Sequence, residues 1–205
     1  ASNKTVFRLE GTRRFGKDRR HRADFSYHYY NRSASTDLRA DIEYKDLSFS
    51  VGETVSATLN INIFKLSYGY AFLSDDRMNI DGGIGLYVMP IETSLSGSTS
   101  GSDAKDITAP LPTLNLHFDF ALTERSYLRQ TIDVLYLELG DFRGGILNMN
   151  MSYEYLLTKN IGLGIGLESL RINVEADGKD YPSIDFIGNI GFNYFGGTLF
   201  ARYYF

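Results

Sequence analysis

The sequence predicts an all-β protein, a transmembrane antiparallel up-and-down β-barrel of about ten strands built as one domain over residues 1–205. Segments of about ten residues alternate between apolar and polar side chains, which is the two-residue period of a strand. Short polar turns alternate with longer links, as in a meander. No apolar run approaches the roughly 18 residues that a membrane-spanning helix needs.

Nine segments carry the alternating pattern. In the clearest one, Leu116 and Phe118 lie on one face, and His117 and Asp119 lie on the other. In chain order, the nine segments are Thr5–Phe15, Arg19–Arg32, Ala57–Leu73, Met78–Ile91, Leu111–Leu122, Tyr127–Leu139, Gly145–Leu156, Ile161–Val174 and Ile184–Phe205.

The links between these segments alternate in length, so the two ends of the predicted barrel differ. The short turns are Gly16–Asp18, Ser74–Asp76, Thr123–Arg125 and Thr158–Asn160. The other links are Ser33–Thr54, the serine-rich Thr93–Ala109, the short Gly140–Gly144, and Glu175–Ser183.

Two segments change the phase of their pattern. Apolar residues occupy the odd positions from Leu59 to Ile63 and the even positions from Phe64 to Phe72, and a comparable change follows Leu167. Such a change requires a β-bulge or a change of environment. We expect a barrel that extends beyond the membrane and holds a small apolar core in that extension. Between Ile161 and Leu167, alternating glycines predict a smooth inner wall that another side chain can approach.

The last segment decides the number of strands. If Gly196–Gly197 is a tight turn, the chain holds ten strands; if it is a kink, the chain holds nine. Antiparallel closure of the usual bacterial kind needs an even number, so the missing strand could lie upstream of Ala1. A lipid-directed last strand that ends on the periplasmic side requires the kink, and that strand should pair with the segment ending near Val174.

The apolar face is expected to meet lipid. Its aromatic residues lie near strand ends, as at Tyr27, Tyr29, Tyr153 and Tyr155. Aromatic girdles of this kind are typical of membrane interfaces. The opposite face carries both bulky charges and glycines, which do not suit the apolar interior of a soluble barrel.

The chain end adds a specific motif. Leu199, Ala201, Tyr203 and Phe205 form an alternating apolar face with a terminal aromatic residue. This ending resembles the insertion signal of Gram-negative outer-membrane barrels, and nearly the whole chain resembles the small outer-membrane β-barrel proteins of the OmpA and OmpX type. The resemblance implies the bacterial outer membrane, contact with its lipid and lipopolysaccharide, and recognition by the outer-membrane assembly machinery during insertion. It implies no particular activity.

With this facing, charged residues line the lumen, and the two signs are interleaved. Unpaired buried charges are costly, so the pattern predicts ion pairs across a narrow interior or, as an alternative, a narrow path for small solutes. The expected lumen residues are Arg8, Glu10, Arg22, Asp24, His28, Lys65, His117, Asp119, Arg129, Asp133, Glu154, Glu168 and Arg202, with Arg14, Asp81 and Asp185 in or near the same space.

These observations favour a non-enzymatic barrel with a structural or interaction role, or a narrow passage for small solutes; a protein partner stays open. The alternative is an outer-membrane hydrolase that acts on lipid or peptide at the barrel wall, because His117 and Asp119 share a strand face. The absence of cysteine excludes thiolate chemistry, and no close-spaced histidine cluster predicts a metal site. The net charge of −4 argues against nucleic acid, and no motif predicts a cofactor.

Overall fold

A computed structural model describes residues 6–37, 41–44, 47–97, 101–139, 142–176 and 188–205. Strands dominate this described part, which contains a single 3₁₀ turn at Lys17–Arg19 and no helix long and apolar enough to span a membrane. The strands are β1 (Phe7–Phe15), β2 (His21–Asp37), β3 (Ile42–Tyr44), β4 (Leu47–Phe49), β5 (Thr54–Ser74), β6 (Met78–Gly97), β7 (Gly101–Thr123), β8 (Ser126–Leu139), β9 (Phe142–Leu156), β10 (Ile161–Ala176) and β11 (Gly188–Tyr203).

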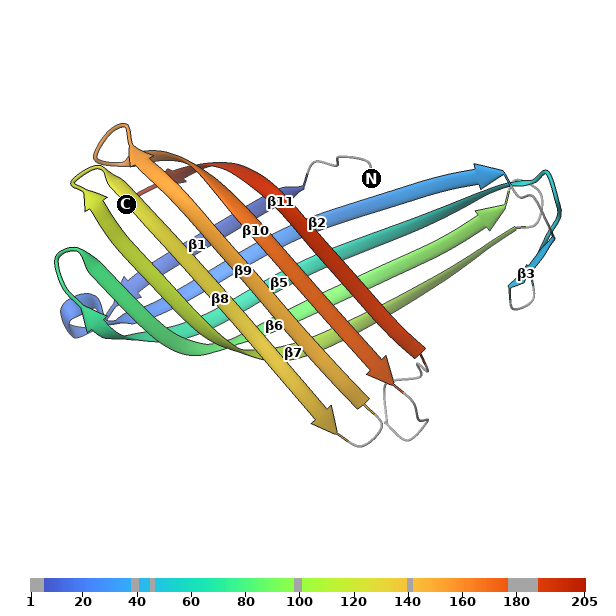
Figure 1. The fold of residues 1–205 in the computed structure, drawn as a ribbon, viewed down its shortest axis with the longest axis horizontal. Coiled ribbons are helices and arrows are strands. Elements are labelled where there is room, and N and C mark those ends of the chain that lie inside the picture. Colours follow the sequence, from blue (N-terminus) through green and yellow to red (C-terminus); the bar gives the residue numbers. More distant parts are fainter. Residues whose placement is uncertain (1–5, 38–40, 45–46, 98–100, 140–141, 177–187) are drawn as a thin grey trace. The chain divides into compact units, whose positions relative to one another are not determined.

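Nine of these strands form one antiparallel sheet in the order β1-β2-β5-β6-β7-β8-β9-β10-β11 (Figure 1). The β3–β4 hairpin forms a separate two-stranded sheet within the link between β2 and β5. When the β3–β4 hairpin is set aside, each strand of the large sheet pairs with the strand before it and the strand after it in the chain, and the predicted all-β, up-and-down fold class is confirmed. Because the order holds nine strands, β1 and β11 stand at its two ends and run in the same direction.

The last strand is continuous. Its register with β10 runs without a shift from Gly188 to Tyr203 and passes through Gly196 and Gly197. The prediction of one long strand that pairs with the segment ending near Val174 is therefore confirmed, and a tight turn at the glycine pair is excluded.

Several strands are longer than predicted. Thr93–Ala109 was expected to be a long loop, but β6 continues to Gly97 and β7 begins at Gly101. That expectation was wrong because it relied on apolar alternation. Backbone pairing needs no apolar face, so a strand can continue through serine-rich sequence when both of its faces are in water.

The chain divides into two compact units. Unit 1 comprises Ala1–Gly11, Asp24–Leu66 and Leu86–Leu111, and unit 2 comprises Thr12–Ala23, Ser67–Gly85 and Pro112–Phe205. Several strands contribute residues to both units, and each unit has its own interior.

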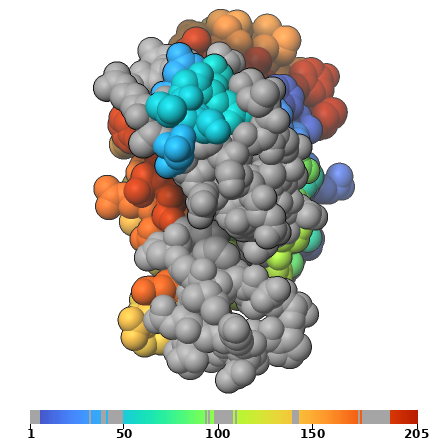
Figure 2. All heavy atoms as spheres, turned by 90° about the vertical axis from the view of Figure 1, so that its right-hand side faces the viewer, coloured from blue at the N-terminus to red at the C-terminus, as the bar shows by residue number. Residues whose placement is uncertain are grey.

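Unit 1 has an apolar core. Ile61 and Ile63 on β5 are buried, and the next outward residues, Phe64 and Leu66, are exposed. Other buried apolar side chains of this unit are Tyr30, Val55, Tyr87, Met89 and Leu111. After β4 the chain makes a turn over residues 50–53, closed by a hydrogen bond from the Glu53 backbone N–H to the Ser50 carbonyl, and Val51 in this turn is exposed. Figure 2 shows this part of the chain in cyan at the surface.

In unit 2, β10 shows what the predicted change of phase means. Ile165 faces outward and is 59% exposed, whereas Leu170 faces inward and is 1% exposed. The register of β10 with both neighbours has no shift between these residues, so the strand keeps the same face inward throughout. The outward face changes from apolar to polar, and the inward face changes from polar to apolar. A change of environment, not a bulge, therefore explains the sequence pattern.

Candidate functional site

A network of arginines and carboxylates lies on the inward face of unit 2, towards the end with the short turns. Seven strands and the residue that follows β11 contribute to it, since each member falls on the inward phase of its alternating pattern. The members are Arg14 on β1, Arg22 on β2, Asp81 on β6, Asp119 on β7, Arg129 on β8, Glu154 on β9, Arg202 on β11, and Tyr204.

The first half of the network surrounds two aspartates. The guanidinium of Arg14 donates to both carboxylate oxygens of Asp81 at 3.0 and 2.7 Å, in the bidentate arrangement that arginine favours. Its Nη2 also lies 2.9 Å from Oδ2 of Asp119. Arg22 Nη1 lies 3.3 Å from Oδ2 of each aspartate. Both carboxylates are therefore held by the same two arginines.

The second half surrounds Glu154, which is 0% exposed. Arg129 and Arg202 both donate to Oε2 of Glu154, the latter at 2.7 Å, and the Tyr204 hydroxyl donates to Oε1 at 2.6 Å. Arg129 Nη2 in turn donates to the Tyr204 hydroxyl at 2.9 Å. Arg129 also connects the two halves, because its Nε lies 3.6 Å from Oδ1 of Asp119.

These contacts require unit 2 to curl around its polar face. Strands β1 and β7 are four steps apart in the sheet order, which corresponds to about 19 Å in a flat sheet. Arg14 and Asp119 nevertheless form an ion pair at 2.9 Å. The network thus forms one layer that leads from Arg14 on β1 to Arg202 on β11. Its four arginines and three carboxylates give a net charge of +1 (4 − 3 = 1).

Inward-facing glycines on β10 leave room for this layer. A Cβ atom at Gly162 would collide with the carboxylate of Glu154, and a Cβ atom at Gly164 would collide with the Phe200 ring. The predicted smooth inner wall is confirmed, since larger residues at these positions would displace a member of the network or a packed aromatic side chain.

A second polar cluster of unit 2 involves Asp133, which is buried. The side-chain amide of Asn115 donates to Asp133 Oδ1 at 2.5 Å and lies 3.2 Å from Thr113 Oγ1. The side chain of Asn115 packs over Gly85, where a Cβ atom would lie 2.7 Å from Oδ1 of the amide.

The structure places most of the predicted lumen residues on the buried face of their strands. In unit 2 these are Arg22, His117, Asp119, Arg129, Asp133, Glu154, Glu168 and Arg202, together with Arg14 and Asp81. In unit 1 they are Arg8, Asp24, His28 and Lys65, whereas Glu10 is more exposed and pairs with Arg8. The side chain of His28 lies 3.2 Å from the Tyr30 hydroxyl, and that of Lys65 lies over the Tyr87 ring at 5.7 Å. Asp185 lies outside the described residues.

Sequence reasoning missed Tyr204. It lies after the end of β11 and belongs to a terminal motif that was interpreted for its outward residues. The available signal was its position two residues after Arg202, which places it on the inward phase of the same strand.

The pair that would support hydrolysis does not form. Within the described part of the chain, the carboxylate of Asp119 is bound by Arg14, Arg22 and Arg129 and not by His117. His117 is buried, so the ring is also not presented at the outer wall. Among these same residues no group of three or more histidine, aspartate or glutamate side chains could hold a metal ion.

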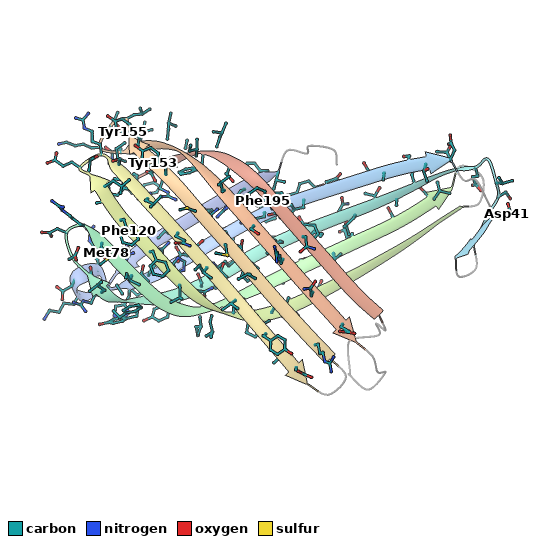
Figure 3. The ribbon with its side chains drawn as sticks, viewed as in Figure 1. Asp41, Met78, Phe120, Tyr153, Tyr155 and Phe195 are labelled. Carbon is teal, nitrogen blue, oxygen red and sulfur yellow. The ribbon has the colours of Figure 1, made fainter. Side chains whose placement is uncertain are left out.

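The outward face of unit 2 is apolar and aromatic. Tyr153 and Tyr155 project from β9 near its turn, and Phe195 projects from β11 (Figure 3). On β11 the residues of the predicted insertion signal face outward: Leu199 is 84% exposed, Ala201 and Tyr203 are exposed, and Phe205 follows on the same phase.

Comparisons with known proteins add no assignment: no protein-family model, curated protein or solved structure matches this chain.

Proposed function

We propose that this protein is an integral β-barrel of the Gram-negative outer membrane, with a non-enzymatic structural or interaction role and an interior closed by the arginine–carboxylate network. The observation that carries the proposal is the distribution of side chains in unit 2. Apolar residues such as Ile165 and Leu199 are exposed, while charges such as Glu154 are buried. A protein dissolved in water gains by the opposite arrangement, since about 25 cal/mol is lost for each Å² of apolar surface left in water.

The extent of this arrangement supports a membrane rather than a protein partner as the apolar environment. The apolar outward face recurs on β5, β6, β7, β9, β10 and β11, and it is bounded by tyrosines near the short turns. A bilayer contacts every strand of a barrel, whereas a protein partner usually covers one patch. The outward residues Leu199, Ala201 and Tyr203 of β11 continue this apolar face and resemble the insertion signal that the outer-membrane assembly machinery recognises.

The network favours a closed interior over a solute passage. A solute passing through unit 2 would have to displace at least one arginine from Asp81, Asp119 or Glu154. Separating a buried ion pair leaves uncompensated charges and costs several kcal/mol. The network therefore acts as a plug that joins the strands from the inside.

The hydrolase alternative has less support. A general base must be oriented for its task and must reach the substrate. Three arginines form ion pairs with the carboxylate of Asp119, so it does not orient His117. His117 itself is buried on the inward face, away from a substrate at the barrel wall.

Location is tested first. The protein should fold in detergent or lipid, should migrate differently on gels with and without heating, and should fractionate with outer membranes. A folded monomer in detergent-free buffer would contradict the proposal.

Conductance and turnover test the role. In planar bilayers the wild-type protein should show no discrete conductance, whereas Asp119→Ala combined with Arg129→Ala should open short-lived conductance steps, because both halves of the network lose their connection. Steady conductance by the wild-type protein would refute the closed interior and would support a solute passage instead. If the wild-type protein hydrolysed lipid or peptide and His117→Ala abolished this activity, the non-enzymatic role would be refuted and the hydrolase alternative supported.

A further inference from the structure

The short turn between β1 and β2 carries a basic patch on unit 2. We define it as Arg13, Lys17, Arg19 and Arg20, with Asp18 as the acidic residue among them. Within the described residues, none of these four basic side chains has an ion pair or a side-chain hydrogen bond. The arginines of the inward network, by contrast, all bind carboxylates. The patch has a net charge of +3 (4 − 1 = 3), with Asp18 as its one acidic residue.

A cluster of rings lies beside this patch. His21 stacks on Phe15 with ring centroids 5.4 Å apart, and it meets the edge of Tyr70 at 5.3 Å. Its Nδ1 lies 2.6 Å from the Tyr68 hydroxyl. The rings of Phe15, Tyr68 and Tyr70 are exposed on the outward face of their strands. Rings with one apolar and one polar side prefer the level of lipid headgroups, which places this end of unit 2 at the membrane surface under the proposed facing.

Arg13 extends the patch onto the bilayer side. It shares the outward phase of β1 with Phe15 and lies two residues further from the turn, which corresponds to about 7 Å along the strand. An arginine on a lipid-facing surface is unfavourable unless its long side chain reaches the headgroup region. The side chain is long enough to bring the guanidinium back to the level of Phe15 and the turn.

We propose that the basic patch binds the phosphate of an anionic phospholipid in the periplasmic leaflet, with the ring cluster packing against the upper part of its acyl chains. This inference rests on the proposed function, because it requires the outward face to meet lipid. Arginine and lysine are the residues that recognise phosphate, by bidentate hydrogen bonds and by charge. The outward position of Arg13 and the rings favours a lipid over an anionic cell-wall polymer, which would reach the tip of the turn but not the bilayer-facing side.

The test measures lipid affinity of the folded, detergent-solubilised protein by native mass spectrometry, with phosphatidylglycerol as the probe and phosphatidylcholine as the uncharged reference. Each basic residue of the patch that lies near the bound anionic headgroup should contribute about a fivefold change in affinity. Arg13→Gln should therefore weaken phosphatidylglycerol binding about fivefold, and Arg19→Gln with Arg20→Gln should weaken it about 25-fold. Phosphatidylcholine binding should not change.

The matched control is Arg125→Gln with Lys159→Gln, which removes two exposed charges from other short turns. This variant should retain wild-type affinity. Equal losses in the control and in the patch variants, or no preference of the wild-type protein for phosphatidylglycerol, would overturn the inference. The inference would also be overturned if inorganic phosphate competed for the patch as well as phosphatidylglycerol does, or if soluble cell-wall fragments bound to the patch in place of lipid.

Failure of this inference can be separated from failure of the proposed function. Heating each sample before electrophoresis reports whether the barrel is folded, and reconstitution into phosphatidylcholine nanodiscs reports whether it enters a bilayer. A wild-type protein that enters nanodiscs without preferring phosphatidylglycerol refutes the lipid site alone. A wild-type protein that does not enter them refutes the membrane assignment.

Discussion

Replacing Glu154 by glutamine should destabilise the protein strongly. The carboxylate of Glu154 is fully buried and accepts hydrogen bonds from Arg129, Arg202 and Tyr204. Glutamine has the shape of glutamate but carries no charge and has only one acceptor oxygen. The NH₂ group of its amide, itself a donor, therefore faces one of the donors that the carboxylate had bound. Removing one partner of a buried ion pair costs about 3 to 5 kcal/mol because the remaining charge stays uncompensated. Two arginines lose their shared carboxylate here, so we expect the free energy of unfolding to fall by an amount in that range.

The assay is urea unfolding of the protein in lipid vesicles, followed by far-ultraviolet circular dichroism and by the gel shift on heating, since the chain contains no tryptophan. The matched control is Glu138→Gln, which removes a carboxylate from the exposed ion pair with Arg143. Exposed pairs contribute little to stability, so the control should unfold like the wild type. If Glu154→Gln unfolds at the same urea concentration as the control, the network is not a stabilising plug and the reasoning is refuted.

Three further predictions concern the outward face, the β1–β2 turn and the loop end of unit 2. Ile165→Arg should lower the free energy of unfolding in vesicles by about 2 to 4 kcal/mol, and Asn173→Arg, beyond the apolar part of the same face, should have little effect. Gly16→Ala should lower the free energy of unfolding by at least about 1 kcal/mol, because the backbone has φ +79° and a Cβ atom there would press against a histidine ring. The Tyr136 hydroxyl, which donates to Glu138, and the charge of the neighbouring Arg143 lower the pKa of Glu138. The small stabilisation from this exposed contact is therefore present above the ordinary glutamate pKa and is lost as the pH falls through the lowered pKa. Tyr136→Phe should raise that pKa, as measured by NMR titration of the carboxyl carbon.

Each of these predictions has an outcome that contradicts it. Equal effects of the two arginine substitutions on β10 would mean that the outward face does not meet lipid. A neutral Gly16→Ala would mean that the turn relaxes to another backbone conformation. An unchanged pKa after Tyr136→Phe would mean that the tyrosine hydroxyl does not bind the carboxylate in solution.

The face of the strand on which each residue lies could be predicted from the sequence. The side-chain period of a strand is two residues and depends only on local backbone geometry, so the faces of Ile165 and Glu154 follow from counting. The same reasoning placed Leu199 and Tyr203 on one face of a continuous last strand, which the register of β10 and β11 confirms. Turn residues such as those around Gly16 marked the strand ends for a similar local reason.

The extent of the strands depended on more than local pattern. Serine-rich sequence around Gly97 lacks alternation, and the strands on either side of it are held by hydrogen bonds to neighbouring strands. The change of phase near Leu167 was also ambiguous in the sequence, because a β-bulge and a change of environment produce the same pattern of apolar and polar residues. Only the unbroken pairing of β10 with both neighbours separates these two explanations.

The sequence by itself determined which charges face inward, and the tertiary structure decided which of them pair. Arg14 binds Asp81 and Asp119, which lie 67 and 105 residues further along the chain, whereas Asp119 does not bind His117, only two residues away. Residues two apart on a strand share a face, but ion pairs form between whichever inward side chains the curled sheet brings within reach. That curl sums the twist of many strand pairs, and no local pattern encodes it.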